Sequence, residues 1–288
     1  MSKYKYSLSL QASARQFLES AVQFVKSNNE NKFKYALFHT ITALELLAKA
    51  CIALEDPFLI ATKNVSNLEF KQGRFQSINI DQAFKLLKRI ANFSLTTEQN
   101  KSITRLKAAR NRFIHFLDNA TVAETKVLVA SGIELFFELH ETEFNDIDDP
   151  WQAKSMAKLA EELSEFQDFV TLRMGSLTNQ LKSLERPKTR HFSECTRCLQ
   201  EADVLIDNEL VCLFCCNRIN IREATEIISE DQSVDICPIC HKPSVAKFQF
   251  KKNGQATYEC FCCGYFRGPE ITWADHKGVI IARLRTFS

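Results

Sequence analysis

Glycine is scarce in this chain, and the first half contains almost none. Gly73 and Gly132 are the only glycines before residue 150 of a chain of 288 residues. So few chain breakers, together with apolar residues that recur every three or four positions, predict long helices rather than a sheet or a loop-rich fold. We therefore expect the first half to be a compact helical bundle.

The sequence also lacks an apolar leader and any uninterrupted apolar run near the length of a membrane span. These absences predict a cytoplasmic protein with no membrane partner. Formal net charge is only +2. So small a charge argues against a protein that coats nucleic acid through its overall charge, but it leaves local basic patches open.

Cysteine is nearly missing from the first two thirds of the chain. Cys51 stands alone on an apolar helical face, where we expect it in the core, and the other ten cysteines follow residue 190. In a chain without a secretory leader, closely paired cysteines are more often metal ligands than disulfides, because the compartment is reducing. The last third is therefore predicted to bind metal.

Apolar periodicity predicts five helices in the first half, over about 8–26, 31–54, 81–90, 96–116 and 121–143. Asp81 and Thr96 are expected to begin the third and the fourth of these helices, and 56–80 is expected to be an irregular connection. A single long helix is expected over 152–184. It would complete the bundle, form a dimer seam or connect the bundle to the cysteine-rich end.

The predicted fold class is mainly α, with a helical bundle followed by small β modules of zinc-ribbon type. An acidic stretch that ends in proline, residues 145–151, suggests the main boundary. We expect a helical domain over 1–149, the long connecting helix over 150–186, and two zinc ribbons over 187–235 and 236–288.

A polar group interrupts the apolar pattern of the helix expected over 96–116. Arg110, Asn111 and His115 fall among residues that otherwise suit a buried stripe, and such groups cost free energy when they are buried without partners. Arginine, a polar residue that is often asparagine, three further positions and histidine make up the signature of the HEPN superfamily (higher eukaryotes and prokaryotes nucleotide-binding). The segment resembles that signature without a gap or a substitution.

The resemblance implies a helical bundle that acts as a metal-independent endoribonuclease. In catalytic members of the superfamily, two copies of the motif meet across a homodimer and form one composite site. Arg110, Asn111 and His115 would then be catalytic, the substrate would be RNA, and no cofactor would be required for cleavage. Several members act as toxins or in anti-phage defence, so we expect that role here, with a possible inhibitor or sensor protein as a partner.

The chemistry of RNA cleavage suits these residue types. Histidine titrates near neutral pH and can act as an acid or a base, and arginine can hold two phosphate oxygens at once. Arg110 and His115 lie about 140° apart around an ideal helix, so one helix does not place them side by side. Glu45 could orient Arg110, although a solvent-facing role suits its position better.

Two pairs of Cys-x-x-Cys motifs are the most specific pattern in the chain. Two such motifs complete the tetrahedral shell that zinc prefers, and the intervening residues suit one β-hairpin in each case. Two structural Zn²⁺ ions are therefore predicted, although the motifs could also alternate in a cross-braced arrangement. Cys216, Cys262 and His241 could replace a ligand but are expected to be spare. The predicted ligands are Cys195, Cys198, Cys212, Cys215, Cys237, Cys240, Cys260 and Cys263.

Charge is divided sharply within the cysteine-rich third. Residues 188–239 hold five Lys or Arg against ten Asp or Glu, whereas 240–288 hold eight against three. The basic half also carries eight aromatic residues, and cations interleaved with aromatic rings suit single-stranded nucleic acid. The same rings could instead fill the core of a small ribbon.

A different class of function also fits the sequence. In this alternative, the protein is a non-catalytic module in which the helical domain dimerises and the zinc ribbons bind nucleic acid or a protein. A third interpretation assigns Arg110 to a surface ion pair and His115 to the C-terminal end of its helix, where positive charge is favourable.

Overall fold

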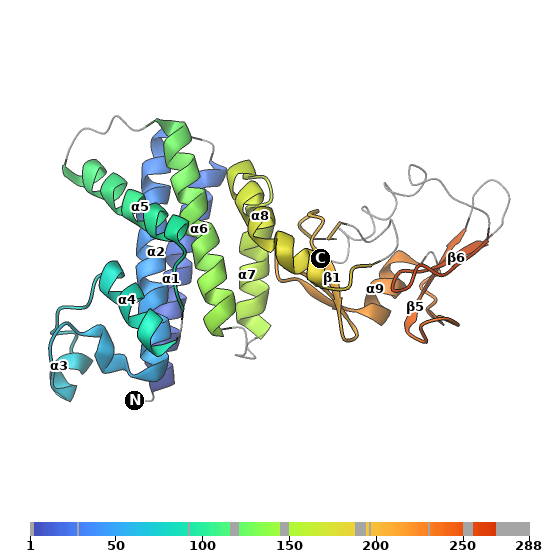
Figure 1. The fold of residues 1–288 in the computed structure, drawn as a ribbon, viewed down its shortest axis with the longest axis horizontal. Helices are drawn as coiled ribbons and strands as arrows, with labels where there is room; N and C mark the ends of the chain where they lie inside the picture. Colours follow the sequence, from blue (N-terminus) through green and yellow to red (C-terminus); the bar gives the residue numbers. More distant parts are fainter. Residues whose placement is uncertain are drawn as a thin grey trace. The chain divides into compact units, whose positions relative to one another are not determined.

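The computed structural model describes residues 3–27, 29–91, 93–115, 121–144, 150–187, 194–195, 197–229, 231–249 and 256–268. The chain divides into two compact units. The first comprises Met1–Asp148 with Phe166–Leu172, and the second comprises Asp149–Glu165 with Arg173–Ser288. The described residues are mainly α-helical, with two small antiparallel sheets near the C-terminal end (Figure 1). The mainly α fold class is therefore confirmed.

The first unit is built around one central helix. Helix α2 (Phe33–Glu55) packs against α1 (Lys3–Lys26), α4 (Ile80–Ile90), α5 (Thr97–His115) and α6 (Val122–Phe144). Its length and composition would allow it to span a membrane together with the preceding residues, since the most apolar stretch within Glu30–Glu55 has a mean hydropathy of 1.6. However, 67% of the most apolar stretch is buried inside the protein, which is the pattern of a core helix.

The helix starts follow local capping chemistry. Thr96 caps α5 as expected, because its Oγ1 accepts from the Gln99 backbone N–H while the Gln99 side chain accepts from the Thr96 backbone N–H. The start of α4 was predicted wrongly. Asn79 rather than Asp81 is the N-cap, and it forms the same reciprocal arrangement with Gln82.

The connection before α4 is more regular than predicted. It contains two short helices, η2 (Pro57–Ile60) and α3 (Asn67–Lys71), and an isolated antiparallel bridge between Ala61 and Ser77. Phe70 of α3 is buried and stacks on Phe75 with the ring centroids 4.8 Å apart. Aromatic packing therefore orders a segment whose polar composition suggested an irregular loop.

Gly132 allows α6 to approach α2 and α5 closely. A Cβ atom at this position would lie 2.5 Å from Cγ2 of Thr40 and 3.1 Å from Cδ1 of Leu106. The first distance is shorter than real carbon contacts, so any larger residue here would force Thr40 or the helices to shift. This close packing fixes α5, which carries the HEPN-like motif, against the core of the unit.

The single helix predicted over 152–184 is in fact two helices. Helix α7 (Pro150–Glu162) and α8 (Gln167–Ser183) are separated by a turn over Leu163–Phe166. Both the backbone N–H and the Oγ of Ser164 donate to the carbonyl of Glu161. This local bonding competes with continuation of the helix, and apolar periodicity does not reveal it.

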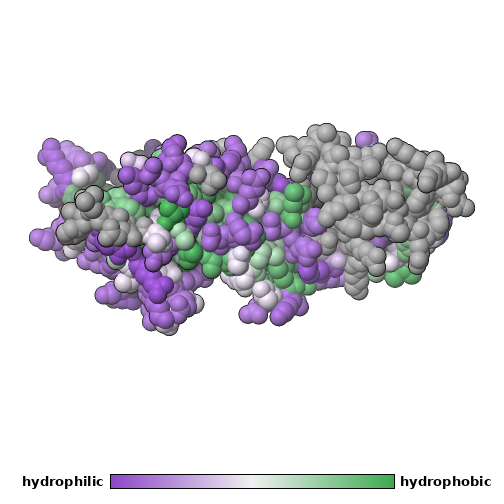
Figure 2. Space-filling model, turned by 90° about the horizontal axis from the view of Figure 1, so that it is seen from above, coloured by the Kyte–Doolittle hydropathy of each residue, from purple (hydrophilic) through white to green (hydrophobic). Residues whose placement is uncertain are grey.

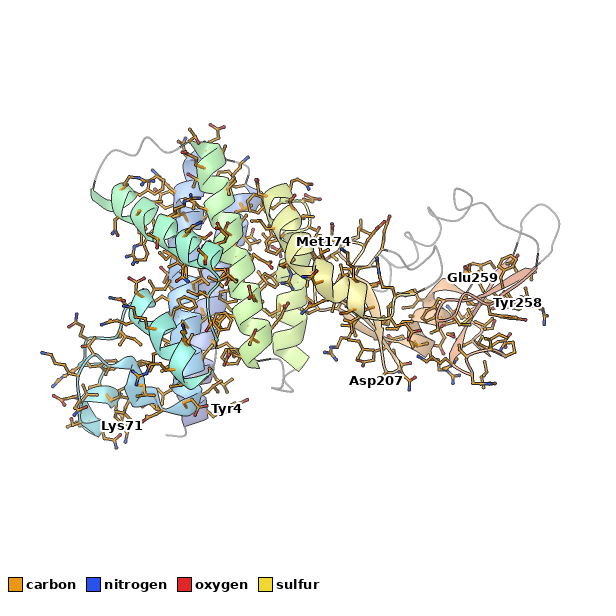
Figure 3. All side chains as sticks on the ribbon, viewed as in Figure 1. Tyr4, Lys71, Met174, Asp207, Tyr258 and Glu259 are labelled. Carbon is orange, nitrogen blue, oxygen red and sulfur yellow. The ribbon has the colours of Figure 1, made fainter. Side chains whose placement is uncertain are left out.

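The second unit contains two small sheets and one short helix. Strands β1 (Asp203–Ile206), β2 (Glu209–Cys212) and β3 (Arg218–Asn220) form one antiparallel sheet. The other sheet is formed by β4 (Asp235–Ile236), β5 (Pro243–Gln249), β6 (Ala256–Cys260) and β7 (Phe266–Arg267). A β-hairpin therefore lies between the two Cys-x-x-Cys motifs of each pair, as predicted. Asp207 lies at the tip of the first hairpin (Figure 3). Its φ is positive, at 52°.

Helix α9 (Ile221–Ile228) joins the two sheets and was not predicted. Its buried residues Ile221 and Ala224 share one hydrophobic cluster with Leu210 of the first sheet and with Val245 and Phe248 of the second. Each ribbon is too small to bury a large core alone, so a shared helix supplies the missing apolar surface.

Candidate functional site

The eight predicted metal ligands gather into two clusters of four. Cys195, Cys198, Cys212 and Cys215 form one cluster, and Cys237, Cys240, Cys260 and Cys263 form the other. Within each cluster the sulfur atoms all lie within 4.8 Å of one another. Neighbouring motifs in the sequence share a cluster, so the ligands pair sequentially and the cross-braced alternative is wrong.

The sulfur spacing fits zinc. Cys195 and Cys215 have their Sγ atoms 3.7 Å apart, and so do Cys198 and Cys212; in the second cluster the Cys237–Cys263 and Cys240–Cys260 distances are 3.5 and 3.6 Å. A tetrahedral ion with Zn–S bonds of about 2.3 Å separates its sulfur ligands by about 3.8 Å. A disulfide requires about 2.0 Å. Both four-cysteine clusters are therefore compatible with zinc binding.

All four motifs adopt the same turn. In each, the backbone N–H that follows the second cysteine donates to the carbonyl of the first cysteine at 2.8 to 2.9 Å. The residue that follows each second cysteine has a positive φ of 57 to 77°. These residues are Leu199, Cys216, His241 and Gly264. One turn used four times aims each pair of sulfur atoms at a common point.

This turn explains why the neighbouring candidates are not ligands. Cys216 and His241 occupy the left-handed position of their turns and take no part in the four-cysteine clusters. Cys262 is 3% exposed and likewise takes no part in either four-cysteine cluster. All three are therefore spare residues, as the sequence suggested.

The thiols of the first cluster impose opposite shifts on one another's pKa. Hydrogen bonds from Cys195 and its neighbours hold the pKa of Cys215 far below its ordinary value. Burial, followed by hydrogen bonds to the other thiols, raises the pKa of Cys212 well above its ordinary value. Four thiolates cannot ionise together at this spacing without a cation among them, because their mutual repulsion is large where water is excluded. A bound divalent ion supplies that positive charge.

Two arginines connect the first cluster to the helices of the same unit. The guanidinium of Arg173 on α8 is almost fully buried and donates to the backbone carbonyls of Phe214 and Leu213, each at 3.0 Å. Those carbonyls belong to the second Cys-x-x-Cys turn. Arg197, in the first turn, forms an ion pair of 2.8 Å with Glu161 of α7.

Arg173 was missed by the sequence reasoning, although a signal was present. It lies three residues after Val170 and four before Leu177, both buried, so the spacing places it on the apolar stripe of α8. A cation at such a position requires specific partners. The sequence alone did not identify them, because the two carbonyls lie about 40 residues further along the chain.

The HEPN-like motif occupies the last turns of α5. Nε and Nη2 of Arg110 lie 3.4 and 3.5 Å from Oδ1 of Asn111, and no carboxylate in the described part of the chain pairs with Arg110. Asn111 is exposed and Arg110 is half-buried. His115 is the last residue of α5, and its side chain lies outside the described residues. The structure therefore places two of the three motif side chains, at the surface of the first unit.

Glu45 has a different partner from the one considered for it. Its carboxylate accepts from the buried ammonium of Lys49 at 2.6 Å, and Lys49 also donates to Ser77 at 3.0 Å. Lys49 is a cation on the core side of α2, and Glu45 neutralises it locally. The role of orienting Arg110 therefore has no support.

The basic, aromatic end of the chain is described only in part. Phe248 and Phe261 are 2% and 1% exposed, so these two rings fill the core. Lys247 pairs with Asp231 at 2.6 Å, and the guanidinium of Arg267 lies 4.9 Å from the ring centre of Tyr258 on β6 (Figure 3). Phe250, Lys251, Lys252, Trp273, Lys277, Arg283 and Arg285 lie outside the described residues.

Comparisons of the chain with models of protein families, with curated proteins and with solved structures found no match.

Proposed function

We propose that the helical unit is a metal-independent endoribonuclease that acts through Arg110, Asn111 and His115 of α5. The observation that carries the proposal is Arg110. Its guanidinium is accessible and pairs with no carboxylate in the part of the chain that the structure describes, and it contacts the side chain of Asn111. A cation left free of ion pairs is available for a phosphate group.

In the proposed reaction, the ribose 2′-oxygen attacks the adjacent phosphorus and the bond to the 5′-oxygen breaks. A base takes the proton of the 2′-hydroxyl, and an acid gives a proton to the departing 5′-oxygen. Histidine suits either role at neutral pH, and Arg110 holds the non-bridging oxygens of the crowded phosphate. The products are a 2′,3′-cyclic phosphate and a 5′-hydroxyl, and no divalent ion takes part.

Two copies of the motif supply the acid and the base in this proposal. Arg110 and His115 lie about 140° apart around α5 if the helix is ideal. A second copy of the chain brings another arginine and another histidine to the same phosphate, so we propose a homodimer through the helical unit. Asn111, whose Oδ1 faces the Arg110 guanidinium, then helps to hold that guanidinium toward the shared phosphate.

The C-terminal unit holds two structural Zn²⁺ ions in this proposal. Each ion has four thiolate ligands, which leaves no open position for a substrate. The ribbons then serve to recognise RNA or a protein partner. By analogy with other HEPN proteins, we propose that RNA cleavage serves as a toxin or in defence against phage, under the control of an inhibitor or sensor protein.

The test is an RNA cleavage assay in EDTA, with exposures brief enough to retain bound zinc. Wild type is compared with Arg110→Ala and His115→Ala at equal zinc content and oligomeric state. We expect cleavage by wild type, a loss of at least about a hundredfold in each variant, and a 2′,3′-cyclic phosphate on the product. Arg112→Ala, which changes an exposed arginine two residues away, is the matched control.

Cleavage that persists unchanged in both motif variants would refute the proposed active site. RNA binding by a wild-type protein that cuts no RNA would favour the non-catalytic binding module instead.

A further inference from the structure

Helices α4 and α5 of the first unit both carry an excess of positive charge. Helix α4 carries three Lys or Arg against one carboxylate, and α5 carries five against one. The neighbouring helix α6 has the opposite balance, with one lysine and five glutamates. Because the net charge of the whole chain is only +2, the basic helices form a local patch of the kind that polyanions bind.

Both carboxylates of these two helices are already neutralised within the patch. Asp81 of α4 pairs with Lys107 of α5, and Glu98 pairs with Lys101 at 2.7 Å. Lys85 and Lys88 of α4 are exposed and pair with no carboxylate in the described part of the chain. Two uncompensated lysines, one helical turn apart, therefore remain available for an anionic ligand.

A cavity of about 320 Å³ lies between α4 and α5, beside these lysines. Phe84 and Ile103 are buried and form an apolar part of its wall. Lys85, Lys88, Ser94 and Asn100 supply polar groups around it, and the carboxylate of Asp81, which is paired with Lys107, also lines it. An apolar wall suits the ring of a nucleobase, and two cations with a hydroxyl suit a phosphate.

The cavity and Asn111 of the HEPN-like motif share one side of α5. Asn100, Thr104 and Asn111 lie within about 40° of one another around the helix axis, and Thr104 precedes Asn111 by about 11 Å. Asn100 and Thr104 line the cavity, whereas Asn111 is exposed near the end of the helix. A strand held in the cavity can therefore follow α5 to the motif. Hydrophilic residues cover much of the first unit on the face drawn in Figure 2.

We propose that the cavity between α4 and α5 binds one nucleotide of a single-stranded RNA, with Lys85 and Lys88 on its phosphate groups. The strand then runs along α5, and its scissile phosphate reaches Arg110. The choice of RNA as the ligand rests on the proposed function, whereas the position of the subsite rests on the cavity and its unpaired lysines.

The test measures binding separately from cleavage. The probe is a fluorescein-labelled single-stranded RNA of mixed sequence with a 2′-O-methyl group on every ribose, which blocks attack by the 2′-oxygen. Binding to the full zinc-loaded chain is followed by fluorescence anisotropy over a series of salt concentrations. Wild type is compared with the double variant Lys85→Ala/Lys88→Ala.

The matched control is the double variant Lys63→Ala/Lys71→Ala. It removes the same charge from the same unit at two exposed lysines outside the cavity (Lys71 is labelled in Figure 3). If each cavity lysine contacts one phosphate, the slope of log affinity against log salt concentration becomes shallower by about 1.4 in Lys85→Ala/Lys88→Ala. The affinity of this variant for RNA then falls roughly twentyfold at about 0.1 M salt. The control should stay within about twofold of wild type.

Equal losses in the two double variants, or no loss in the cavity variant, would overturn the subsite. A second arm titrates uridine 5′-monophosphate. Binding of this nucleotide that depends on Lys85 and Lys88, without any effect of those lysines on RNA affinity, would overturn RNA as the occupant. Neither result depends on catalysis, so failure of the subsite can be distinguished from failure of the proposed ribonuclease activity.

Discussion

Arg173 offers the sharpest test of how helix α8 supports the first cysteine cluster. Arg173 is 1% exposed, and its guanidinium donates to the carbonyls of Phe214 and Leu213, each at 3.0 Å. Both carbonyls lie between the ligands Cys212 and Cys215. Replacement by methionine keeps a long side chain of similar reach and removes the donors, so Arg173→Met isolates the hydrogen bonds from the packing.

The expected cost follows from those two bonds. A hydrogen bond from a charged donor contributes about 1.5 to 3 kcal/mol, and an acceptor left buried without a partner loses a similar amount. Part of this loss is offset because a buried charge is removed as well. We therefore expect a net destabilisation of about 3 kcal/mol, which corresponds to about a hundredfold weaker retention of one metal ion where folding and metal binding are coupled.

The assay is chelator competition on the zinc-loaded protein, with the released metal followed by a coloured zinc indicator. Arg173→Met should release one of two zinc equivalents at about a hundredfold lower chelator concentration. The ion held by Cys237, Cys240, Cys260 and Cys263 should be unaffected, which provides a control within each molecule. Arg197→Met is the external control. Its ion pair with Glu161 is partly exposed, so it should change stability by about 1 kcal/mol or less.

Release of both ions at the wild-type chelator concentration from Arg173→Met would refute this reasoning. So would an equal effect of Arg197→Met, because the loss would then reflect general weakening of the turns rather than the two buried carbonyls.

Two further outcomes are expected. Cys198→Ser should lower the zinc content from two ions to one, whereas Cys216→Ser should leave it at two, because of these two residues only Cys198 belongs to a four-cysteine cluster. Metal analysis by mass spectrometry checks both variants. A loss of zinc from Cys216→Ser would contradict the ligand assignment. Burial, followed by the charge of Arg15, lowers the pKa of His140 from 6.5 to about 4, so the folded state keeps this ring neutral while the unfolded chain binds a proton below pH 6.5. Stability should therefore fall by up to about 3 kcal/mol as the pH drops from 6.5 to 4. In urea unfolding at several pH values, the free energy of unfolding of His140→Gln should lack this share of the pH dependence. A stability difference between wild type and His140→Gln that is the same at every pH would contradict the prediction.

The helices of the first unit could be predicted because their information is local. Apolar spacing predicted the ends of α1, α2, α5 and α6 to within a few residues, except that α1 begins earlier than predicted, at Lys3. The cysteine clusters were predictable for a similar reason. Each Cys-x-x-Cys motif carries its own turn, and four thiols with this spacing suit one kind of ion.

Other features could not be read from apolar spacing, because a local bond overrides that spacing or because they depend on contacts between distant segments. Apolar periodicity runs through Ser164, and only its bonds to Glu161 show that α7 ends there. Helix α9 forms where it buries Ile221 against a second ribbon, and that ribbon lies further along the chain. The cavity between α4 and α5 depends on how both helices pack on α2.

The sequence by itself therefore determined the residue types and their local spacing, which include the HEPN-like motif, the eight thiols and the helical periodicity. Only the tertiary structure decided that the cysteine motifs pair sequentially, that the buried Lys49 donates to Ser77 and that Arg173 binds two carbonyls of a metal-site turn. The physical reason is distance along the chain. Periodicity and turns arise from neighbouring residues, whereas the partner of a buried charge depends on which segments the folded core brings together.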